Sequence, residues 1–416
     1  MTERPVVVVG AGLAGLCCAR ELHRRGMPTL VLEASDGVGG RVRTDLHDGF
    51  LLDRGFQVLL TAYPECRAVL DYDALDLRPF FPGSLVRRGG RVHRVADPWR
   101  KPLQSLLTLF TPVGGLGDKL RVARFRAAVR GRTIEEIFAA PERTAAEALR
   151  DRGFSEEMLD RFFRPFFGGV FLERDLSTSS RMLEFLFKMF SEGNTAIPAA
   201  GMQSIPLQIA AGLPEGCLRT GARVDSVRPD RVLLEGGEEI HAASVVIATD
   251  GAEYGRLVPG EQRTRFRSTV CLYFDAPEPP VREPILVLDG DGRGPANHVC
   301  VVSEVAPGYA PEGRALVSVN VVEPASLEPT EDLERGVREQ MGEWFGSAAA
   351  DWRLLRAYRI PRALPSAEAG ALDPPSRPVA LESGLFVCGD HRENGSIQGA
   401  MASGRRAAQA ISADRT

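Results

Sequence analysis

Three glycines near the start of the chain, Gly10, Gly12 and Gly15, have a spacing that suits phosphate chemistry. They follow a run of four valines and open a helix-forming stretch over residues 13–25, so the pattern predicts a buried strand, a tight turn and a helix. Glycine at 10 and 12 lets the backbone approach a pyrophosphate, and Gly15 lets the helix pack closely on the strand. The alternative is a glycine-rich turn that only packs.

The helix start and the end of the next strand complete this pattern. Free N–H groups at the helix start, at Leu13 and Ala14, favour the negative charge of a phosphate. A second strand over residues 29–33 ends at Glu33, followed by Ala34, and a carboxylate there accepts hydrogen bonds from an adenosine ribose. The carboxylate also disfavours a 2′-phosphate. The first forty residues therefore predict a dinucleotide site.

A second glycine turn, Gly39-Gly40-Arg41, follows Glu33 after a few residues. The planar fork of an arginine can bond two phosphate oxygens at once. We expect this turn and its arginine to face the same pyrophosphate. The alternative is a surface turn with a solvated arginine.

Composition limits the classes of protein to which the chain can belong. It has 416 residues, 44% of them hydrophobic and 25% charged, and a net charge of −4, which is typical of a globular protein and argues against nucleic acid as the partner. Its seven cysteines form no C-x-x-C pair and no spacing of a metal site, so no metal is expected. No basic leader and no run of 18 apolar residues appears, and a cytoplasmic location is expected.

With both glycine turns, the sequence resembles the superfamily of FAD-binding amine oxidases, phytoene desaturases and protoporphyrinogen oxidases. The resemblance implies FAD rather than NAD. Non-covalent binding is expected, because Cys388 lies inside the predicted strand before Gly389. The resemblance also assigns further cofactor contacts. The segment "LLDRGFQVL" is similar to the family's segment beside the flavin ring, and "GARVDS" and "VVIATD" are similar to its later FAD segments. The residues implied are Arg54, Gly55, Phe56, Gln57, Val224, Ala248 and Thr249.

The C-terminal segment "CGDHRENGSIQGAMASG" is similar to the family's closing motif. The resemblance implies that Gly389 and Asp390 bind the ribityl or phosphate side of FAD. It implies further that Ser396, Ile397 and Gln398 lie against the flavin ring, where a helix start favours negative charge. Nearby, His391 could move protons if Glu393 oriented it; the alternative is that these side chains only bridge loops. His391 and Gln57 are the catalytic candidates.

The resemblance implies an α/β fold with a Rossmann-like FAD-binding domain of the glutathione-reductase type. We expect this domain to be assembled from residues 1–85, 195–260 and 355–416. Residues 86–194, which look mostly helical, and residues 261–354, with alternating runs and a helix near 331–345, would form a mixed α+β substrate domain.

The implied reaction is removal of hydride from a small-molecule substrate, with oxygen or a diffusible acceptor reoxidising the flavin. In amine oxidases of the superfamily, an aromatic residue precedes the closing motif and a lysine of the substrate domain lies near the flavin. Here Ser396 takes the aromatic position, and residues 261–354 contain no lysine. The sequence therefore favours a dehydrogenase or desaturase of an apolar or polycyclic molecule. Amine oxidation with an atypical cage and redox-neutral isomerisation are the alternatives.

The expected helical segment contains two further patterns. The apolar run "LQSLLTLF" precedes a basic amphipathic stretch with Lys119 and Arg126, which is typical either of contact with an anionic membrane or of a solvated helix face. Farther on, "RFFRPFFGGVF" contains five phenylalanines. They predict core packing or an apolar substrate wall. The sequence leaves the oligomeric state open.

Overall fold

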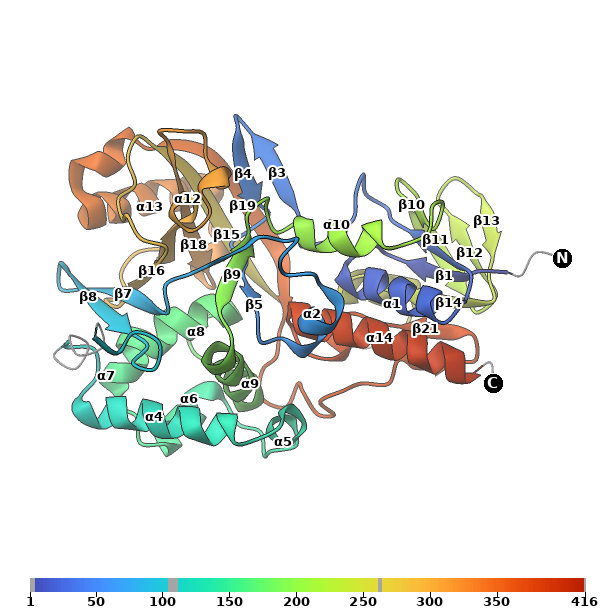
Figure 1. Cartoon of the computed structure of the whole chain (residues 1–416), viewed down its shortest axis with the longest axis horizontal. Coiled ribbons are helices and arrows are strands. Elements are labelled where there is room, and N and C mark those ends of the chain that lie inside the picture. The colour runs from blue at the N-terminus through green and yellow to red at the C-terminus, as the bar shows by residue number, and fades with distance from the viewer. Residues whose placement is uncertain (1–3, 104–110, 261–263, 415–416) are drawn as a thin grey trace.

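The computed structural model of this protein describes residues 4–103, 111–260 and 264–414. A six-stranded sheet forms one end of the molecule (Figure 1). Its strands, in spatial order, are β10 (Leu218–Arg219), β2 (Thr29–Leu32), β1 (Val6–Val9), β14 (Ser244–Ile247), β21 (Leu385–Val387) and β20 (Ala380–Glu382). All neighbouring pairs are parallel except β20 with β21. The valines of β1 are buried on both faces, as expected of a parallel strand inside a layered α/β structure.

Two layers cover this sheet. Val6 and Val8 of β1 belong to a hydrophobic core that also contains residues of α1 (Leu13–Arg24) and α14 (Ile397–Asp414). Val7 and Val9 belong to a second hydrophobic core, which contains residues of a three-stranded sheet. The strands of that sheet are β11 (Val224–Arg228), β12 (Arg231–Leu234) and β13 (Glu239–His241). The helices α1 and α14 lie side by side (Figure 1). The first and last helices therefore begin at the same edge of the parallel sheet.

A seven-stranded sheet forms the core of the other half of the molecule. Its strands, in spatial order, are β19 (Arg353–Pro365), β15 (Phe266–Ala276), β18 (Ala315–Val322), β17 (Ala296–Val301), β16 (Leu286–Asp289), β7 (Gly83–Arg88) and β8 (Arg91–Ala96). Helix α13 (Thr330–Phe345) packs on it through Leu333, Val337 and Met341.

This sheet differs from the predicted segments at two places. A mostly helical segment was predicted to begin at residue 86, where the structure has the hairpin β7–β8. A cofactor segment was predicted to begin at residue 355, which lies inside β19. The hairpin and β19 both join the seven-stranded sheet, because β7 pairs in parallel with β16 and β19 pairs with β15. The division into a cofactor and a substrate domain itself stays a prediction.

Helices surround one flank of the seven-stranded sheet. They are α4 (Leu116–Arg130), α5 (Ile134–Phe138), α6 (Ala145–Asp151), α7 (Glu156–Met158), a π-helical turn (Leu159–Phe163), α8 (Arg164–Phe171) and α9 (Ser180–Glu192). The remaining helices and strands are β3 (Thr44–His47), β4 (Phe50–Asp53), β5 (Leu59–Leu60), α2 (Pro64–Val69), β6 (Leu77–Pro79), β9 (Thr195–Pro198), α10 (Ser204–Ala211), α11 (Gly251–Leu257) and α12 (Val302–Val305). Strand β9 pairs with both β5 and β6, and so ties the helical part to the rest.

The basic stretch predicted from the sequence forms helix α4. Its Phe125 and Val129 are buried, and Phe125 stacks on Phe187 of α9 with a ring separation of 4.4 Å, so one face of α4 packs on protein. Leu116 and Leu120 are exposed. Most of the preceding apolar run, residues 104–110, lies outside the described residues.

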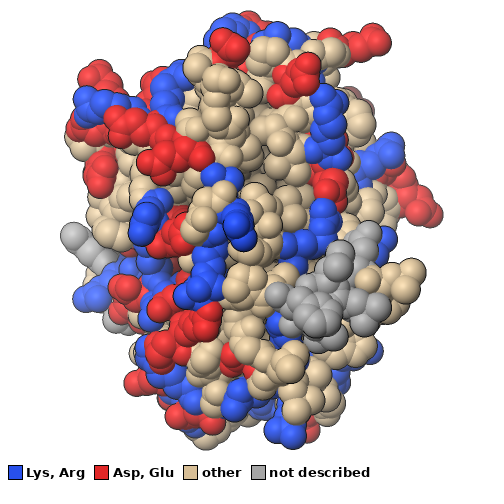
Figure 2. Space-filling model, turned by 90° about the vertical axis from the view of Figure 1, so that its left-hand side faces the viewer, with Lys and Arg blue, Asp and Glu red and all other residues tan. Residues whose placement is uncertain are grey.

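The end of the molecule formed by the seven-stranded sheet and the helical part has an interspersed pattern of charge. Figure 2 shows acidic and basic side chains side by side over this face. In the described ranges, no helix has the length and apolar character needed to cross a membrane.

Candidate functional site

A cavity of about 940 Å³ joins the two halves of the molecule. Its wall includes the N-terminal glycine turns, the end of β14, the start of α14 and the phenylalanines of α8 and α9. Of the cofactor residues predicted from the sequence, all except Gly15 and Gln398 line this cavity. Segments from the beginning, middle and end of the chain thus contribute to one site.

The two glycine turns touch each other at the cavity wall. The Gly39 N–H donates to the Ala11 carbonyl over 2.9 Å, and an added Cβ at Gly40 would lie 3.4 Å from the Gly12 Cα. At Gly12 an added Cβ would meet no atom of the described residues within 4 Å, so that position opens towards the cavity. A pyrophosphate could therefore approach the backbone here.

Gly10 and Gly15 have a different function from Gly12. Gly10 has φ of +109°, and an added Cβ there would lie 2.8 Å from the Ala248 carbonyl oxygen. A Cβ at Gly15 would lie 2.0 Å from the Gly10 carbonyl oxygen. These two positions accept only glycine because the strand, the turn and the helix are pressed together. Gly15 supports the site without lining it.

Glu33 holds the first turn from the end of β2. One carboxylate oxygen accepts a hydrogen bond from the Ala11 N–H at 2.8 Å, and the other accepts from the N–H and hydroxyl of Ser35 at 2.9 and 2.7 Å. Since a carboxylate has about four acceptor positions, Glu33 can still accept a hydrogen bond from a ligand.

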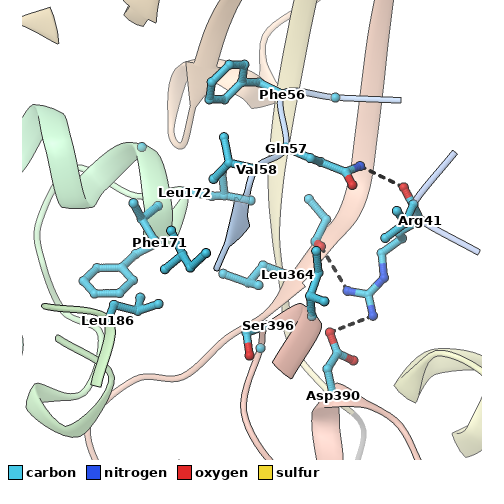
Figure 3. Close-up of a pocket in the computed structure, with 18 of the residues that line it drawn as sticks. Arg41, Phe56, Gln57, Val58, Phe171, Leu172, Leu186, Leu364, Asp390 and Ser396 are labelled. Atoms are coloured by element: carbon cyan, nitrogen blue, oxygen red, sulfur yellow. Dashed lines mark hydrogen bonds and ion pairs between the residues drawn. The ribbon is translucent and has the colours of Figure 1, made fainter. Parts of the chain in front are cut away.

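Arg41 links the second turn to the C-terminal segment (Figure 3). Its guanidinium lies 2.7 Å from the Asp390 carboxylate and donates to the Ala363 carbonyl over 3.0 Å. Burial by itself would lower the pKa of Arg41, but the carboxylate of Asp390 holds that pKa above its usual value. The arginine predicted to face phosphate is thus paired with a carboxylate and a carbonyl of the protein.

The segment predicted to lie beside the flavin ring is held by its own polar side chains. The Gln57 amide donates to the Arg41 and Arg54 carbonyls over 2.8 and 3.2 Å. Arg54 makes an ion pair with Asp45 at 2.9 Å, and Gly55 has φ of +95°. Phe56 and Gln57 line the cavity in this fixed loop; a catalytic part for Gln57 stays a prediction.

The C-terminal segment meets the cavity at the start of α14. The Ser396 hydroxyl accepts the Gly399 N–H at 2.9 Å and donates to the Asn394 side chain over 2.6 Å, which is the bonding of a helix N-cap. Ser396 and Ile397 line the cavity. The Gln398 side chain instead accepts the Glu65 N–H at 2.8 Å, so it supports α2 and does not line the cavity.

His391 does not line the cavity, although it follows Asp390 in sequence. Its ring is buried and packs 5.5 Å from the ring of Tyr254, and within the described part of the chain neither ring nitrogen has a hydrogen-bond partner. Burial lowers the pKa of His391 to about 4, against the opposing influence of Asp390. The ring is therefore neutral near pH 7, and a catalytic part for it stays a prediction.

The far end of the cavity is an apolar chamber, which the sequence predicted only in part. Phe162, Phe166, Phe167 and Phe171 of the predicted cluster line it, whereas Phe163 is fully buried in the core. The other chamber residues are Met158, Val170, Leu172, Met182, Leu186, Phe187 and Phe190. In Figure 3, Phe171, Leu172 and Leu186 face Val58 and Leu364 across the space beside Gln57. Such a wall suits an apolar ligand.

A group of cations lies beside this chamber. The sequence indicated Lys119 and Arg126 only as part of the basic stretch, and it did not indicate Arg100. Arg100, Lys119 and Arg126 line the cavity. Arg100 donates to the carbonyls of Phe190 and Gly193, and Arg126 donates to the Ser191 carbonyl over 2.9 Å. Both arginines therefore stabilise the C-terminus of α9, where carbonyls have no partner within the helix.

Comparisons with known proteins agree with this geometry. A model of the family described as flavin containing amine oxidoreductase matches residues 13–412. Protoporphyrinogen oxidase 2 of Arabidopsis thaliana is 29% identical over 170 residues, 41% of this chain and 33% of that protein. Coproporphyrinogen III oxidase of Mycobacterium leprae is 29% identical over 237 residues, 54% of this chain and 50% of that protein. The matched regions thus cover a third and a half of the lengths of these two relatives.

Solved structures share the fold over nearly the whole chain. Putrescine oxidase bound to putrescine superposes with a TM-score of 0.74 and 19% identity over 99% of both chains. An oxidoreductase from Methanosarcina mazei superposes with a TM-score of 0.77 and 17% identity, over 97% of this chain and all of that one. Fold and site together define an FAD-dependent oxidoreductase. The chain belongs to the flavin containing amine oxidoreductase family.

The described residues fit the cofactor of that family. The open position at Gly12, the α1 start and the remaining acceptor position of Glu33 suit a pyrophosphate and a ribose. The α14 start at Ile397 can stabilise negative charge on a ring placed against it. All seven cysteines are buried, and Cys388 does not line the cavity, which agrees with non-covalent binding.

Proposed function

We propose that this protein is a dehydrogenase or desaturase that removes hydride from an apolar or polycyclic small molecule. The observation that carries the proposal is the continuity of one cavity, from the glycine turns at Gly12 and Gly40 to the apolar chamber. FAD bound there would accept the hydride, and oxygen or another diffusible acceptor would then reoxidise it.

In this proposal the chain's own residues bind, orient and exclude water. The glycine turns and Glu33 hold the dinucleotide half, which makes the six-stranded sheet a Rossmann-like domain of the glutathione-reductase type. The segment from Gly55 to Gln57 and the α14 start lie along the flavin ring. The phenylalanines of α8 and α9 position the substrate and keep the chamber dry, so that the reacting C–H bond is held at a fixed distance.

Two features support a polycyclic substrate over an amine. The relatives named protoporphyrinogen oxidase and coproporphyrinogen III oxidase match the chain over 170 and 237 residues. Ser396 is used as the N-cap of α14, so the position that carries a cage aromatic in amine oxidases is occupied by a small polar residue. Tetrapyrrole porphyrinogens are therefore the first substrates to test.

The experiment is anaerobic mixing of the FAD-loaded protein with a porphyrinogen or with putrescine, followed by flavin absorbance. We expect the porphyrinogen to bleach the flavin and to yield the oxidised ring, and putrescine to leave the flavin oxidised. Bleaching by putrescine with release of ammonia in air would establish amine oxidation instead. Rearrangement of a substrate by dithionite-reduced protein, without net oxidation, would establish an isomerase.

A further inference from the structure

His298 is a buried histidine in the cavity wall that neither the sequence patterns nor the cofactor site accounts for. It lies on β17, with 4% of its surface exposed, and it lines the cavity. Its ring lies 4.9 Å from the ring of Phe56 in an edge-on arrangement. His298 therefore lies next to the loop of Phe56 and Gln57 proposed to hold the flavin ring.

The neighbouring side chain fixes the tautomer of His298. The Asn297 amide nitrogen donates to the Pro165 carbonyl over 2.9 Å and lies 3.2 Å from the His298 Nδ1. An amide nitrogen can only donate, so Nδ1 must accept and the ring proton must be on Nε2. The opposite orientation of the amide would place its oxygen against the Pro165 carbonyl oxygen, which is unfavourable.

The Nε2 donor that results has no acceptor in the protein. His298 Nε2 is buried and lacks a hydrogen-bond partner among the described residues. A buried donor without an acceptor destabilises the protein, because the group has lost its hydrogen bond to water and gained none in return. Burial also lowers the pKa of His298 to about 4. The ring is therefore neutral near pH 7, and no positive charge on it attracts an anion.

The surrounding backbone maintains this arrangement. An added Cβ at Gly169 of α8 would lie 2.9 Å from both the Asn297 amide nitrogen and the His298 Nδ1. Glycine at 169 thus lets the helix pack directly on the two side chains. The contact with Asn297 and His298 explains why residue 169 is a glycine. Because the helix packs so closely on it, the imidazole ring of His298 has little freedom to rotate and point its Nε2–H in another direction.

We propose that His298 donates a hydrogen bond from Nε2 to an oxygen acceptor of the substrate, and so determines which molecules the apolar chamber selects. This proposal rests on the proposed function and deepens it. The preferred ligand has a largely apolar skeleton with a carbonyl or carboxylate oxygen near the end that enters beside Phe56. An ammonium group is disfavoured, because it has no acceptor for a hydrogen bond from the Nε2–H.

A matched pair of probes tests the proposal on the FAD-loaded protein. 2-Acetylnaphthalene and 2-isopropenylnaphthalene have nearly the same shape, and only the ketone carries an acceptor. Dissociation constants are measured from the perturbation of flavin absorbance. We expect the wild type to prefer the ketone, and His298→Phe to lose about tenfold in ketone affinity with little change for the alkene, as expected for one lost hydrogen bond.

Two variants control for a merely structural effect. His298→Gln keeps an amide donor and should retain part of the preference, and His241→Phe replaces an exposed histidine on β13 and should change nothing. Equal loss of both probes in His298→Phe, or a wild type that does not distinguish the probes, would overturn the proposal. Failure of the wild type to retain FAD would instead contradict the proposed function.

A second measurement does not depend on any variant. The ¹⁵N chemical shifts of the histidine ring nitrogens in the FAD-loaded protein identify the tautomer directly. We expect His298 to carry its proton on Nε2 and to remain neutral from pH 8 down to about pH 5. A proton on Nδ1, or protonation of the ring near its ordinary pKa, would contradict the proposal.

Discussion

Arg41 and Asp390 are separated by 349 residues in the sequence and by 2.7 Å between their charged groups in the structure. Asp390 ends the strand-and-turn motif at the C-terminus, and Arg41 ends the second glycine turn. The Asp390 side chain is 7% exposed and that of Arg41 34%. The contact closes the cofactor end of the cavity by joining the two ends of the chain.

Loss of Arg41 should therefore weaken both stability and FAD retention. Arg41→Met keeps the apolar stem but leaves the buried Asp390 carboxylate without its cation. The variant should lose about 2 kcal/mol of unfolding free energy, which is less than for a fully buried pair because Arg41 is partly exposed. Urea denaturation of the apoprotein measures this cost. The double variant with Asp390→Asn should recover part of it; strictly additive losses would show that the two residues do not interact.

Asp53 should make stability fall as pH rises through the acid range. Its carboxylate is buried and accepts hydrogen bonds from Thr44, Met202 and Tyr309, yet burial outweighs these bonds and raises the pKa of Asp53 to about 6. Because the folded state then binds the proton more tightly than the unfolded chain, the unfolding free energy decreases between about pH 4 and pH 6.

The variant Asp53→Asn isolates this contribution. An amide keeps the acceptor for Thr44 and Met202, and its nitrogen can donate to the Tyr309 oxygen. Relative to the wild type, the variant should gain up to about 3 kcal/mol on going from pH 4 to pH 7. Urea denaturation at both pH values measures the difference; a wild type and a variant with parallel pH dependence would contradict the assignment.

His391 should affect acid stability rather than turnover. Its pKa is lowered to about 4 by burial, so the unfolded chain binds more protons between pH 6.5 and 4 and the unfolding free energy falls as pH falls. His391→Phe removes this loss, and denaturation should show a smaller acid destabilisation than in the wild type. Since the ring does not line the cavity, the rate of flavin reduction should keep its pH profile. Loss of one limb of that profile would instead make His391 the catalytic base.

Ser396 should be required for the start of α14. Ser396→Ala removes the acceptor of the Gly399 N–H and should lower the unfolding free energy by about 1 kcal/mol. Ser396→Thr keeps that acceptor and should be close to the wild type in stability. Thermal denaturation compares them. Equal destabilisation by both variants would mean that the N-cap contributes nothing measurable.

Local patterns were sufficient to predict the elements around the dinucleotide end of the cavity. The valines of β1, the turn from Gly10 to Gly15 and the strand before Gly389 each carry their signal within a few residues, because strand burial, turn geometry and helix starts are local properties. The alternating runs predicted within residues 261–354 likewise contain strands of the seven-stranded sheet.

Contacts between distant segments could not be predicted in this way. The parallel pairing of β7 with β16 joins residues about two hundred positions apart, and no periodicity encodes a partner strand. The ion pair of Arg41 with Asp390 and the position of His298 in the cavity wall depend on tertiary packing in the same way. The signal for His298 was present only as a histidine in a buried strand, which is more often a core residue.

Titration of the apoprotein with FAD, followed by flavin absorbance and fluorescence, is the decisive experiment for the cofactor site. The wild type should bind FAD stoichiometrically. Gly12→Val, which fills the open position in the first turn, should bind it far more weakly. Gly342→Val, at a position in α13 that is equally free of neighbours, should bind it like the wild type. A wild type that binds no FAD, or a Gly12→Val variant with full occupancy, would show that the glycine turns do not form an FAD site.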